Sequence, residues 1–238
     1  GQDGFARFRF LGDPSPEADA EHVRSCKEWQ RTLFDRGWAG IAWPKEYGGR
    51  GATPAEARIF AREQARFDVD AGAFAVGIGM VGPTLIAHGT EAQKQRYLPA
   101  LLRGDEVWCQ LFSEPGAGSD LAGLRTRAVR DGDEWVVDGQ KVWSSGAHHS
   151  ELGILLARTD PGAPKHKGIT YFVLDMRSPG IEVRPLRQIN GVAHFNEVFL
   201  THVRIPHENV VGEVNGGWSV ALSTLGAERV LIGSGGAV

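Results

Sequence analysis

The sequence has few cysteines and no long uninterrupted apolar run. Its two cysteines, Cys26 and Cys109, lie far apart and outside any C-x-x-C pair, so the spacing indicates neither a disulfide framework nor a zinc site. The longest apolar run, residues 71–87, is interrupted by glycines and Pro83, whereas a membrane span needs about 20 apolar residues. We therefore expect two reduced thiols in a cytoplasmic protein with no membrane span and no secretory leader.

A strong excess of charge of one sign is also missing. Lys and Arg total 26 and Asp and Glu total 29, which gives a formal net charge of −3. No basic block stands out, so nothing indicates nucleic-acid binding. With 42% hydrophobic and 23% charged residues, the composition is that of a globular protein.

Residues 1–105 follow a helical pattern. Gly37 and Gly104 each come directly after an apolar stripe of helical spacing, which is where helices end in a left-handed glycine. Thr90 and Gln93 have the spacing of a capping box. The predicted helices cover residues 16–36, 53–67, 71–87 (as a buried pair) and 90–104.

From residue 106 onward the pattern changes to short segments rich in β-branched and aromatic residues, separated by turns. Asp138-Gly139 predicts a tight hairpin. Without intervening helices, the strands indicate an antiparallel barrel or sandwich, and residues 217–233 return to a helical pattern. The predicted strands cover residues 107–113, 124–130, 134–143, 152–158, 168–175, 181–187 and 195–203. The fold class is α+β, with a helical domain (1–105), an antiparallel β-barrel domain (106–213) and the start of a C-terminal helical bundle (214–238).

Two polar clusters flank a glycine-rich turn within residues 108–145. One strand ends in Ser113 and Glu114, and a later strand carries Trp143 followed by two serines. Strand pairing would bring these clusters together into one surface, which we call the wall. A tryptophan beside hydroxyls suits a flat heteroaromatic ring, because it offers a face for packing and donors for the ring edge.

The glycine turn, residues 115–120, leaves two interpretations open. Leu121 stands where a dinucleotide-binding G-x-G-x-x-G needs its third glycine, and Ala117 and Leu121 replace both glycines of a G-x-S-x-G elbow around Ser119. The turn is therefore either a plain turn or a nest of N–H groups that binds a phosphate with the help of Ser119.

His148 and His149 raise the question of a metal site. Neighbouring residues of a strand point to opposite faces, and the sequence places no acidic or cysteine partner at ligand spacing. We therefore expect no metal.

Residues 111–122 and 138–146 resemble the acyl-CoA dehydrogenase family. They read LFSEPGAGSDLA and DGQKVWSSG. Further similar stretches, in the same order as in the family, cover residues 43–49, 89–98 and 203–210. The family fold implied by this resemblance has an N-terminal helical domain, a middle β-barrel and a C-terminal helical domain, and the implied cofactor is FAD.

The resemblance also implies roles for individual residues. Ser113 stands where a hydroxyl meets the pyrimidine side of the flavin, Trp143 where an indole flanks it, and Ser145 where a hydroxyl lies near N5. Residues implied to bind the acyl-CoA are Ser119, His166 and Arg229. The implied cofactor-binding residues are Gln110, Phe112, Ser113, Gly118, Ser119, Trp143, Ser144 and Ser145.

The implied reaction removes the α-proton of an acyl-CoA thioester while the β-hydrogen leaves as hydride to flavin N5, which gives the trans-2-enoyl-CoA. In one branch of the family the base is a glutamate in a Glu-Arg pair on the first helix of the C-terminal domain. Glu228-Arg229 matches this pattern. In another branch the base lies later in that domain, and a plain solvated helix carboxylate is the alternative for Glu228.

Residues 188–197 depart from the Arg…Ser-Asp-Thr run of many relatives. They resemble an actinobacterial-type subgroup, some members of which pair with a non-identical subunit and accept bulky CoA thioesters, including steroid side chains. The resemblance thus implies a homotetramer or a heterotetramer with a related subunit, and an electron-transfer flavoprotein as electron acceptor. The alternatives are an acyl-CoA oxidase and a non-catalytic partner subunit.

Overall fold

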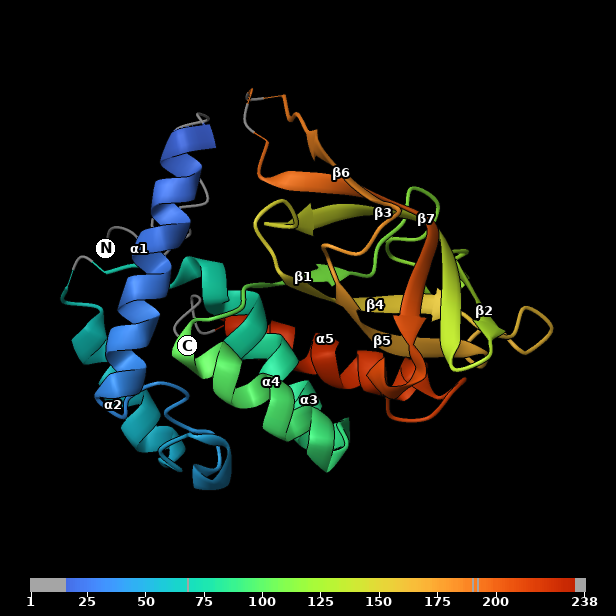
Figure 1. Ribbon diagram of the computed structural model, residues 1–238. Helices are drawn as coiled ribbons and strands as arrows, with labels where there is room; N and C mark the ends of the chain where they lie inside the picture. Colours follow the sequence, from blue (N-terminus) through green and yellow to red (C-terminus); the bar gives the residue numbers. More distant parts are fainter. Residues whose placement is uncertain (1–15, 68, 190, 192, 234–238) are drawn as a thin grey trace.

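The structure, a computed structural model, describes residues 16–67, 69–189, 191 and 193–233. Within these residues, four α-helices precede the first strand and one follows the last. Figure 1 shows α1 to α4 gathered beside the sheet and α5 beneath β5. The order of helices, strands and a final helix matches the prediction from sequence. The α-helices are α1 (Pro16–Asp35), α2 (Pro54–Gln64), α3 (Gly82–His88), α4 (Glu91–Arg103) and α5 (Gly217–Gly233).

The ends of these helices follow local rules. Thr90 and Gln93 form the predicted capping box at the start of α4, and Gly104 ends the helix in a left-handed conformation with φ 78°. A second capping box, Thr53 with Glu56, begins α2. That helix ends at Gln64, three residues before the predicted end.

Residues 71–87 form helical structure as expected, but not as a simple pair of helices. A 3-10 turn (Gly72–Phe74) and a π-helix (Gly77–Val81) precede α3. A Cβ on Gly82 would lie 1.9 Å from the Trp43 ring, and one on Gly77 would lie 2.5 Å from Leu101. Glycine at these positions therefore allows the segment to lie close against its neighbours.

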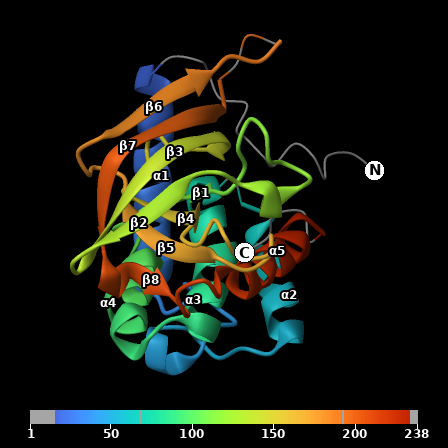
Figure 2. The same cartoon turned by 90° about the vertical axis from the view of Figure 1, so that its right-hand side faces the viewer.

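The strands form a single sheet of order β6-β7-β3-β2-β4-β5-β8, with β1 added beside β4. Figure 2 shows these strands above α3, α4 and α5. Most neighbours are antiparallel, but β1 and β2 both run parallel to β4. The sheet is therefore mixed and not purely antiparallel as expected. The strands are β1 (Trp108–Leu111), β2 (Arg127–Asp131), β3 (Glu134–Ser145), β4 (Leu152–Arg158), β5 (Ile169–Asp175), β6 (Ile181–Leu186), β7 (Phe195–Pro206) and β8 (Val210–Val211).

The predicted hairpin at Asp138-Gly139 is wrong. Strand β3 continues through both residues, and the pairing of β3 with β7 shifts register between Val137 and Gly139. Asp138 Oδ1 accepts a hydrogen bond from the His202 amide at 2.8 Å, while a Cβ on Gly139 would lie 2.4 Å from Thr126 Oγ1. The Asp-Gly pair thus forms a β-bulge, and the hairpin between β2 and β3 turns at Gly132, with φ 61°.

Strands β4 and β5 are buried on both faces. Their side chains point alternately into two cores. The first core is shared with the helices and contains Trp108, Ile154 and Tyr171. The second core is formed by residues of the strands and contains Trp135, Leu155 and Phe172. The first core holds the helical region and the sheet together. No helix within the described residues is both long and apolar enough for a membrane span.

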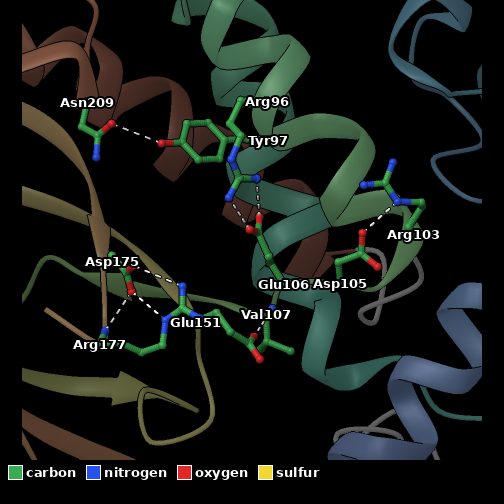
Figure 3. A network of polar contacts seen from close by, with 10 residues as sticks. All are labelled: Arg96, Tyr97, Arg103, Asp105, Glu106, Val107, Glu151, Asp175, Arg177 and Asn209. Atoms are coloured by element: carbon green, nitrogen blue, oxygen red, sulfur yellow. Dashed lines mark hydrogen bonds and ion pairs between the residues drawn. The ribbon is translucent and has the colours of Figure 1, made fainter. Parts of the chain in front are cut away.

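A polar network surrounds the junction between α4 and the sheet (Figure 3). Arg96 on α4 pairs with Glu106 at 2.6 Å, and the Tyr97 hydroxyl donates to Asn209 at 3.2 Å. Glu151 accepts from the Val107 amide at 2.7 Å. These contacts fix the point at which the chain leaves the helices and begins β1.

Candidate active site

The two polar clusters of the wall lie next to each other. After β1 ends at Leu111, the chain runs beside a second bulge in β3, where the Val142 amide donates to the Ser113 carbonyl at 2.9 Å. This bulge lies between Lys141 and Ser144 in the pairing with β7. The structure therefore brings Phe112 and Ser113 to the same place as residues 143–145, as the sequence predicted.

Glu114, which the sequence analysis assigned to the wall, is instead buried beneath it in an ion pair. Lys141 is fully buried, and its Nζ donates to Glu114 Oε1 at 2.8 Å and to the Phe112 carbonyl at 3.0 Å. Glu114 also accepts from the Arg125 and Thr126 amides at 2.6 and 2.9 Å. One carboxylate and one ammonium thus tie together the end of β1, β3 and the segment before β2.

The two charges shift each other's titration. Burial lowers the pKa of Lys141 to about 8, and the nearby Glu114 carboxylate offsets only part of this effect. Burial alone would raise the pKa of Glu114, but the charge and hydrogen bond of Lys141, together with the two amides, lower it below its ordinary value. Both groups are therefore charged at neutral pH.

Trp143 has an unusual backbone. Its φ is 63°, a conformation that bulky residues rarely adopt. The ring is 55% exposed and meets Phe195 edge to face at 5.5 Å. An exposed indole whose backbone conformation costs free energy indicates a ligand-binding surface.

The two serines after Trp143 differ in their surroundings. The Ser144 Oγ is buried and has no hydrogen-bond partner among the described residues, whereas the Ser144 carbonyl accepts from Asn196 Nδ2 at 3.0 Å. Ser145 is half-buried and lines a cavity. The Ser144 hydroxyl is thus enclosed in the protein, and the hydroxyl beside the exposed indole that can meet a polar heteroaromatic ligand is that of the half-buried Ser145.

The glycine turn is tight and open to solvent. Glu114 and Ala117 exchange backbone hydrogen bonds of 2.9 and 3.0 Å, and neither Gly116 nor Gly118 has a positive φ. A Cβ built on Gly118 would meet nothing within 4 Å. Since Ser119 is exposed beside this open space, both interpretations of the turn, plain or phosphate-binding, remain compatible with the structure.

Glu228, predicted as the base, contacts β1, the strand that leads into the wall. It is half-buried on α5, and Gln110 Nε2 on β1 donates to its Oε2 at 3.5 Å. This contact joins residues 118 positions apart in sequence. Arg229 is exposed, with no hydrogen bond or ion pair to a described residue. The structure therefore joins the predicted base to one predicted cofactor residue.

The predicted acyl-CoA residues Ser119 and His166 lie on neighbouring loops. Lys165 Nζ pairs with the Asp120 carboxylate at 2.6 Å, which joins the loop before β5 to the glycine turn. The His166 ring lies 5.0 Å from the Trp218 ring at the start of α5. Sequence reasoning gave no role to Trp218, whose aromatic ring extends this exposed region.

His148 and His149 do not lie on a strand, contrary to the premise used in the sequence analysis. They follow β3 in a turn, and the Nε2 atoms of both rings lie 2.8 and 2.7 Å from Asp19 Oδ2 on α1. Asn196 Nδ2 donates to His148 Nδ1, so the proton of a neutral His148 is on Nε2 and is donated to Asp19. The sequence could not indicate this acidic partner, which is 129 residues away.

The chain matches two family models: "Acyl-CoA dehydrogenase, N-terminal domain" over residues 12–105 and "Acyl-CoA dehydrogenase, middle domain" over residues 109–203. The chain belongs to the acyl-CoA dehydrogenase family. Members of this family are flavoproteins that bind FAD, and the wall offers an isoalloxazine the partly exposed residues Ser113 and Ser145 beside the exposed face of Trp143.

Several named acyl-CoA dehydrogenases are similar to this chain. It is 54% identical to acyl-CoA dehydrogenase FadE34 of Mycobacterium tuberculosis over 94% of the chain and 32% of the relative. It is 44% identical to acyl-CoA dehydrogenase IpdE1 of the same organism over 94% of the chain and 58% of the relative. The chain thus spans about a third to three fifths of these relatives.

Among solved structures, the Tcur3481-Tcur3483 steroid ACAD superimposes with a TM-score of 0.79 at 41% identity, covering 91% of this chain and 58% of that one. The ChsE4-ChsE5 complex of M. tuberculosis gives a TM-score of 0.76 at 35% identity, covering 95% and 58%. Both similarities extend over the helices and the sheet described above.

Proposed function

We propose that this protein is an FAD-dependent acyl-CoA dehydrogenase that oxidises an acyl-CoA thioester to its trans-2-enoyl-CoA. The observation that supports this proposal is the contact between Glu228 and Gln110, a carboxylate of α5 and a side chain of β1, the strand that leads into the wall. A base must lie within reach of the substrate that the cofactor wall presents. The proposal includes the cytoplasmic location expected from the sequence.

In this proposal, the residues of the wall orient the cofactor and Glu228 takes the proton. Trp143 provides a face for the ring, Ser113 and Ser145 provide hydroxyls for its edge, and the enclosed Ser144 holds the strand between them in place. When bound, FAD supplies the acceptor for the hydride that leaves the β-carbon. Glu228 removes the α-proton, so that the two hydrogens depart and the carbon–carbon double bond forms.

The acyl-CoA is proposed to lie over the glycine turn, with Ser119, His166 and Arg229 as contacts. Support comes from the Lys165–Asp120 pair, which joins the loop of His166 to the turn of Ser119. Trp218 adds an aromatic face to the same region. An electron-transfer flavoprotein is the proposed electron acceptor, in place of the O₂ that an oxidase would use.

A bulky acyl group and a heteromeric assembly are part of the proposal. One similar solved structure is named a steroid ACAD, and another is a complex of two differently named subunits, ChsE4 and ChsE5. These neighbours favour a heterotetramer with a related subunit over a homotetramer. They also favour acyl groups larger than a straight fatty chain.

The test is anaerobic reduction of the FAD-loaded, full-length protein by short, long, branched and steroid acyl-CoAs. Glu228→Gln should keep FAD and acyl-CoA binding but lower the rate of flavin bleaching by about a hundredfold or more, because the base is lost. Glu213→Gln, at an exposed position before α5, is the matched control and should reduce at the normal rate. Near-normal bleaching in Glu228→Gln would place the base elsewhere.

The second candidate is a non-catalytic subunit that completes a flavin site shared with a related chain. The neighbouring complex of two subunits motivates this alternative. If the full-length protein binds FAD only after a second gene product is added, and Glu228→Gln then leaves turnover unchanged, the partner-subunit function replaces the enzyme function.

A further inference from the structure

Helix α5, which carries Glu228, packs against β5 and α3 (Figure 1). Its two charged residues, Glu228 and Arg229, are adjacent in sequence but differ in their surroundings, since Arg229 is exposed and Glu228 is half-buried. A rotation of the helix by one residue, about 100°, would exchange these surroundings. The rotation of α5 about its axis therefore decides whether Glu228 faces β1.

Burial of apolar side chains alone leaves this rotation weakly determined. The outer side of α5 carries Leu222, Val230 and Ile232, and all three are exposed. Apolar residues thus occupy both sides of the helix, so that the helix has no single apolar face to bury. A directional contact is needed to select one rotation, and hydrogen bonds are directional.

A chain of buried hydroxyls supplies such a contact. Tyr171 of β5, Thr224 of α5 and Thr84 of α3 are all buried. Thr224 Oγ1 lies 3.1 Å from the Tyr171 hydroxyl and 2.9 Å from Thr84 Oγ1. Thr84 Oγ1 in turn donates to the Met80 carbonyl at 2.8 Å. When Tyr171 donates to Thr224 and Thr224 donates to Thr84, every hydroxyl proton of the chain has an acceptor.

Thr224, in the middle of this chain, lies one helical turn before Glu228. Residues four apart lie on the same face of a helix, so Thr224 and Glu228 share the inner face of α5. Leu231, three residues after Glu228, is buried in a cluster with Ala75 and Met80. The proposed base therefore lies between a hydrogen-bonded contact and an apolar contact of the same helix.

We propose that Thr224 is a positioning residue for the reaction, whose hydroxyl fixes the rotation of α5 and so directs the Glu228 carboxylate toward Gln110 on β1. Thr224 is fully buried, so it acts through Glu228 and not by touching a ligand. A displacement of about 1 Å can slow a reaction about a hundredfold. The inference deepens the proposed function and rests on it, because it requires Glu228 to be the base.

The experiment measures anaerobic flavin reduction in the FAD-loaded, full-length protein. The probe is the acyl-CoA that reduces the unmutated protein fastest among the short, long, branched and steroid thioesters. Thr224→Val, which removes the hydroxyl, should slow reduction about tenfold to a hundredfold. Thr224→Ser keeps the hydroxyl and should restore the rate. The concentration dependence of the rate should give the same affinity for the probe in both variants, because only the base has moved.

Combination with Glu228→Gln separates positioning from general damage. If Thr224 acts through Glu228, Thr224→Val should not slow the residual reduction by Glu228→Gln any further. Tyr171→Phe removes one hydroxyl and keeps the ring, so it should slow reduction with the same dependence on Glu228, and it tests the chain even where Thr224→Val does not fold. Val203→Ala, at a fully buried position of the second core, is the matched control. It should lower the denaturation midpoint but leave the rate and the FAD absorbance unchanged.

Reduction at the normal rate in both Thr224→Val and Tyr171→Phe would overturn the inference. Equal slowing in Thr224→Val and Thr224→Ser, or the same slowing by Thr224→Val in the Glu228→Gln protein, would also overturn it, because either result indicates damage to packing. With a slow Glu228→Gln protein, these results leave the proposed function intact. Near-normal reduction by Glu228→Gln would instead refute the base of the proposed function, and the inference with it.

Discussion

At the scale of single residues, the strongest constraint on the wall is the charge buried beneath it. Lys141 has no exposed surface, and its partner Glu114 accepts from two backbone amides as well as from the ammonium. Removing one partner of such a pair leaves an uncompensated buried charge. The wall therefore depends on a pair that itself is not expected to touch FAD.

Lys141→Met should lower the free energy of unfolding by about 3–5 kcal/mol, because it leaves the Glu114 carboxylate unpaired. The double variant with Glu114→Gln should recover at least about 2 kcal/mol of this loss, since the buried charge is then gone. Chemical denaturation of the purified protein measures both values. Arg204→Ala, which breaks exposed pairs with Asp131 and Glu134, is the control and should cost about 1 kcal/mol or less.

A loss of less than about 1 kcal/mol in Lys141→Met would show that the pair is solvated and does not support the wall. A double variant as unstable as Lys141→Met would show that the lysine acts through its bond to the Phe112 carbonyl and not through Glu114.

The sequence predicted some contacts of the candidate site and missed others for an identifiable reason. Strand patterns in the sequence were enough to predict that Ser113 lies near Trp143 and the two serines after it. Asp19 and Asn196 were missed, since their relation to His148 arises from packing between elements far apart in the chain. Their contacts have no local sequence signal.

At the scale of elements, the capping pattern predicted the ends of helix α4 correctly, whereas the Asp-Gly pair wrongly predicted a hairpin. Thr90 with Gln93 is a local interaction, so the sequence contains all that is needed for it. Asp138-Gly139 has the composition of a hairpin, but Thr126 approaches Gly139 so closely that the glycine is needed for packing. A contact between β3 and the segment before β2 overrode the local turn preference.

Gly139→Ala should therefore destabilise the protein by about 1–3 kcal/mol, as expected for an inserted methyl group in a filled site. A Cβ there would lie 2.7 Å from both Cα and Cβ of Thr126, so a side-chain rotation cannot relieve the clash. Gly116→Ala is the control, because a Cβ there meets nothing within 4 Å. Equal denaturation midpoints for the two variants would contradict the packing explanation of the bulge.

At the scale of the whole molecule, helices and sheet share one core. Leu98 of α4, Ile154 of β4 and Val220 of α5 belong to the same buried cluster. Thr224 of α5 also bonds to the Tyr171 hydroxyl of β5 at 3.1 Å and to the Thr84 hydroxyl of α3 at 2.9 Å. The sequence patterns separate a helical region from a sheet region at residue 106, but side chains of both regions are buried in the same core.

This shared core predicts that the two regions unfold together. Leu98→Ala creates a cavity in a fully buried position and should cost about 2–5 kcal/mol. Hydrogen exchange followed by mass spectrometry should show the same loss of protection for amides of α4 and for those of β3 and β7, whose side chains belong to the other core. Leu200→Ala, in that second core, is the reciprocal variant and should in turn reduce the protection of α4. If each substitution lowers protection only in its own region, then the helices and the sheet are separate cooperative units, and the core they share does not couple them.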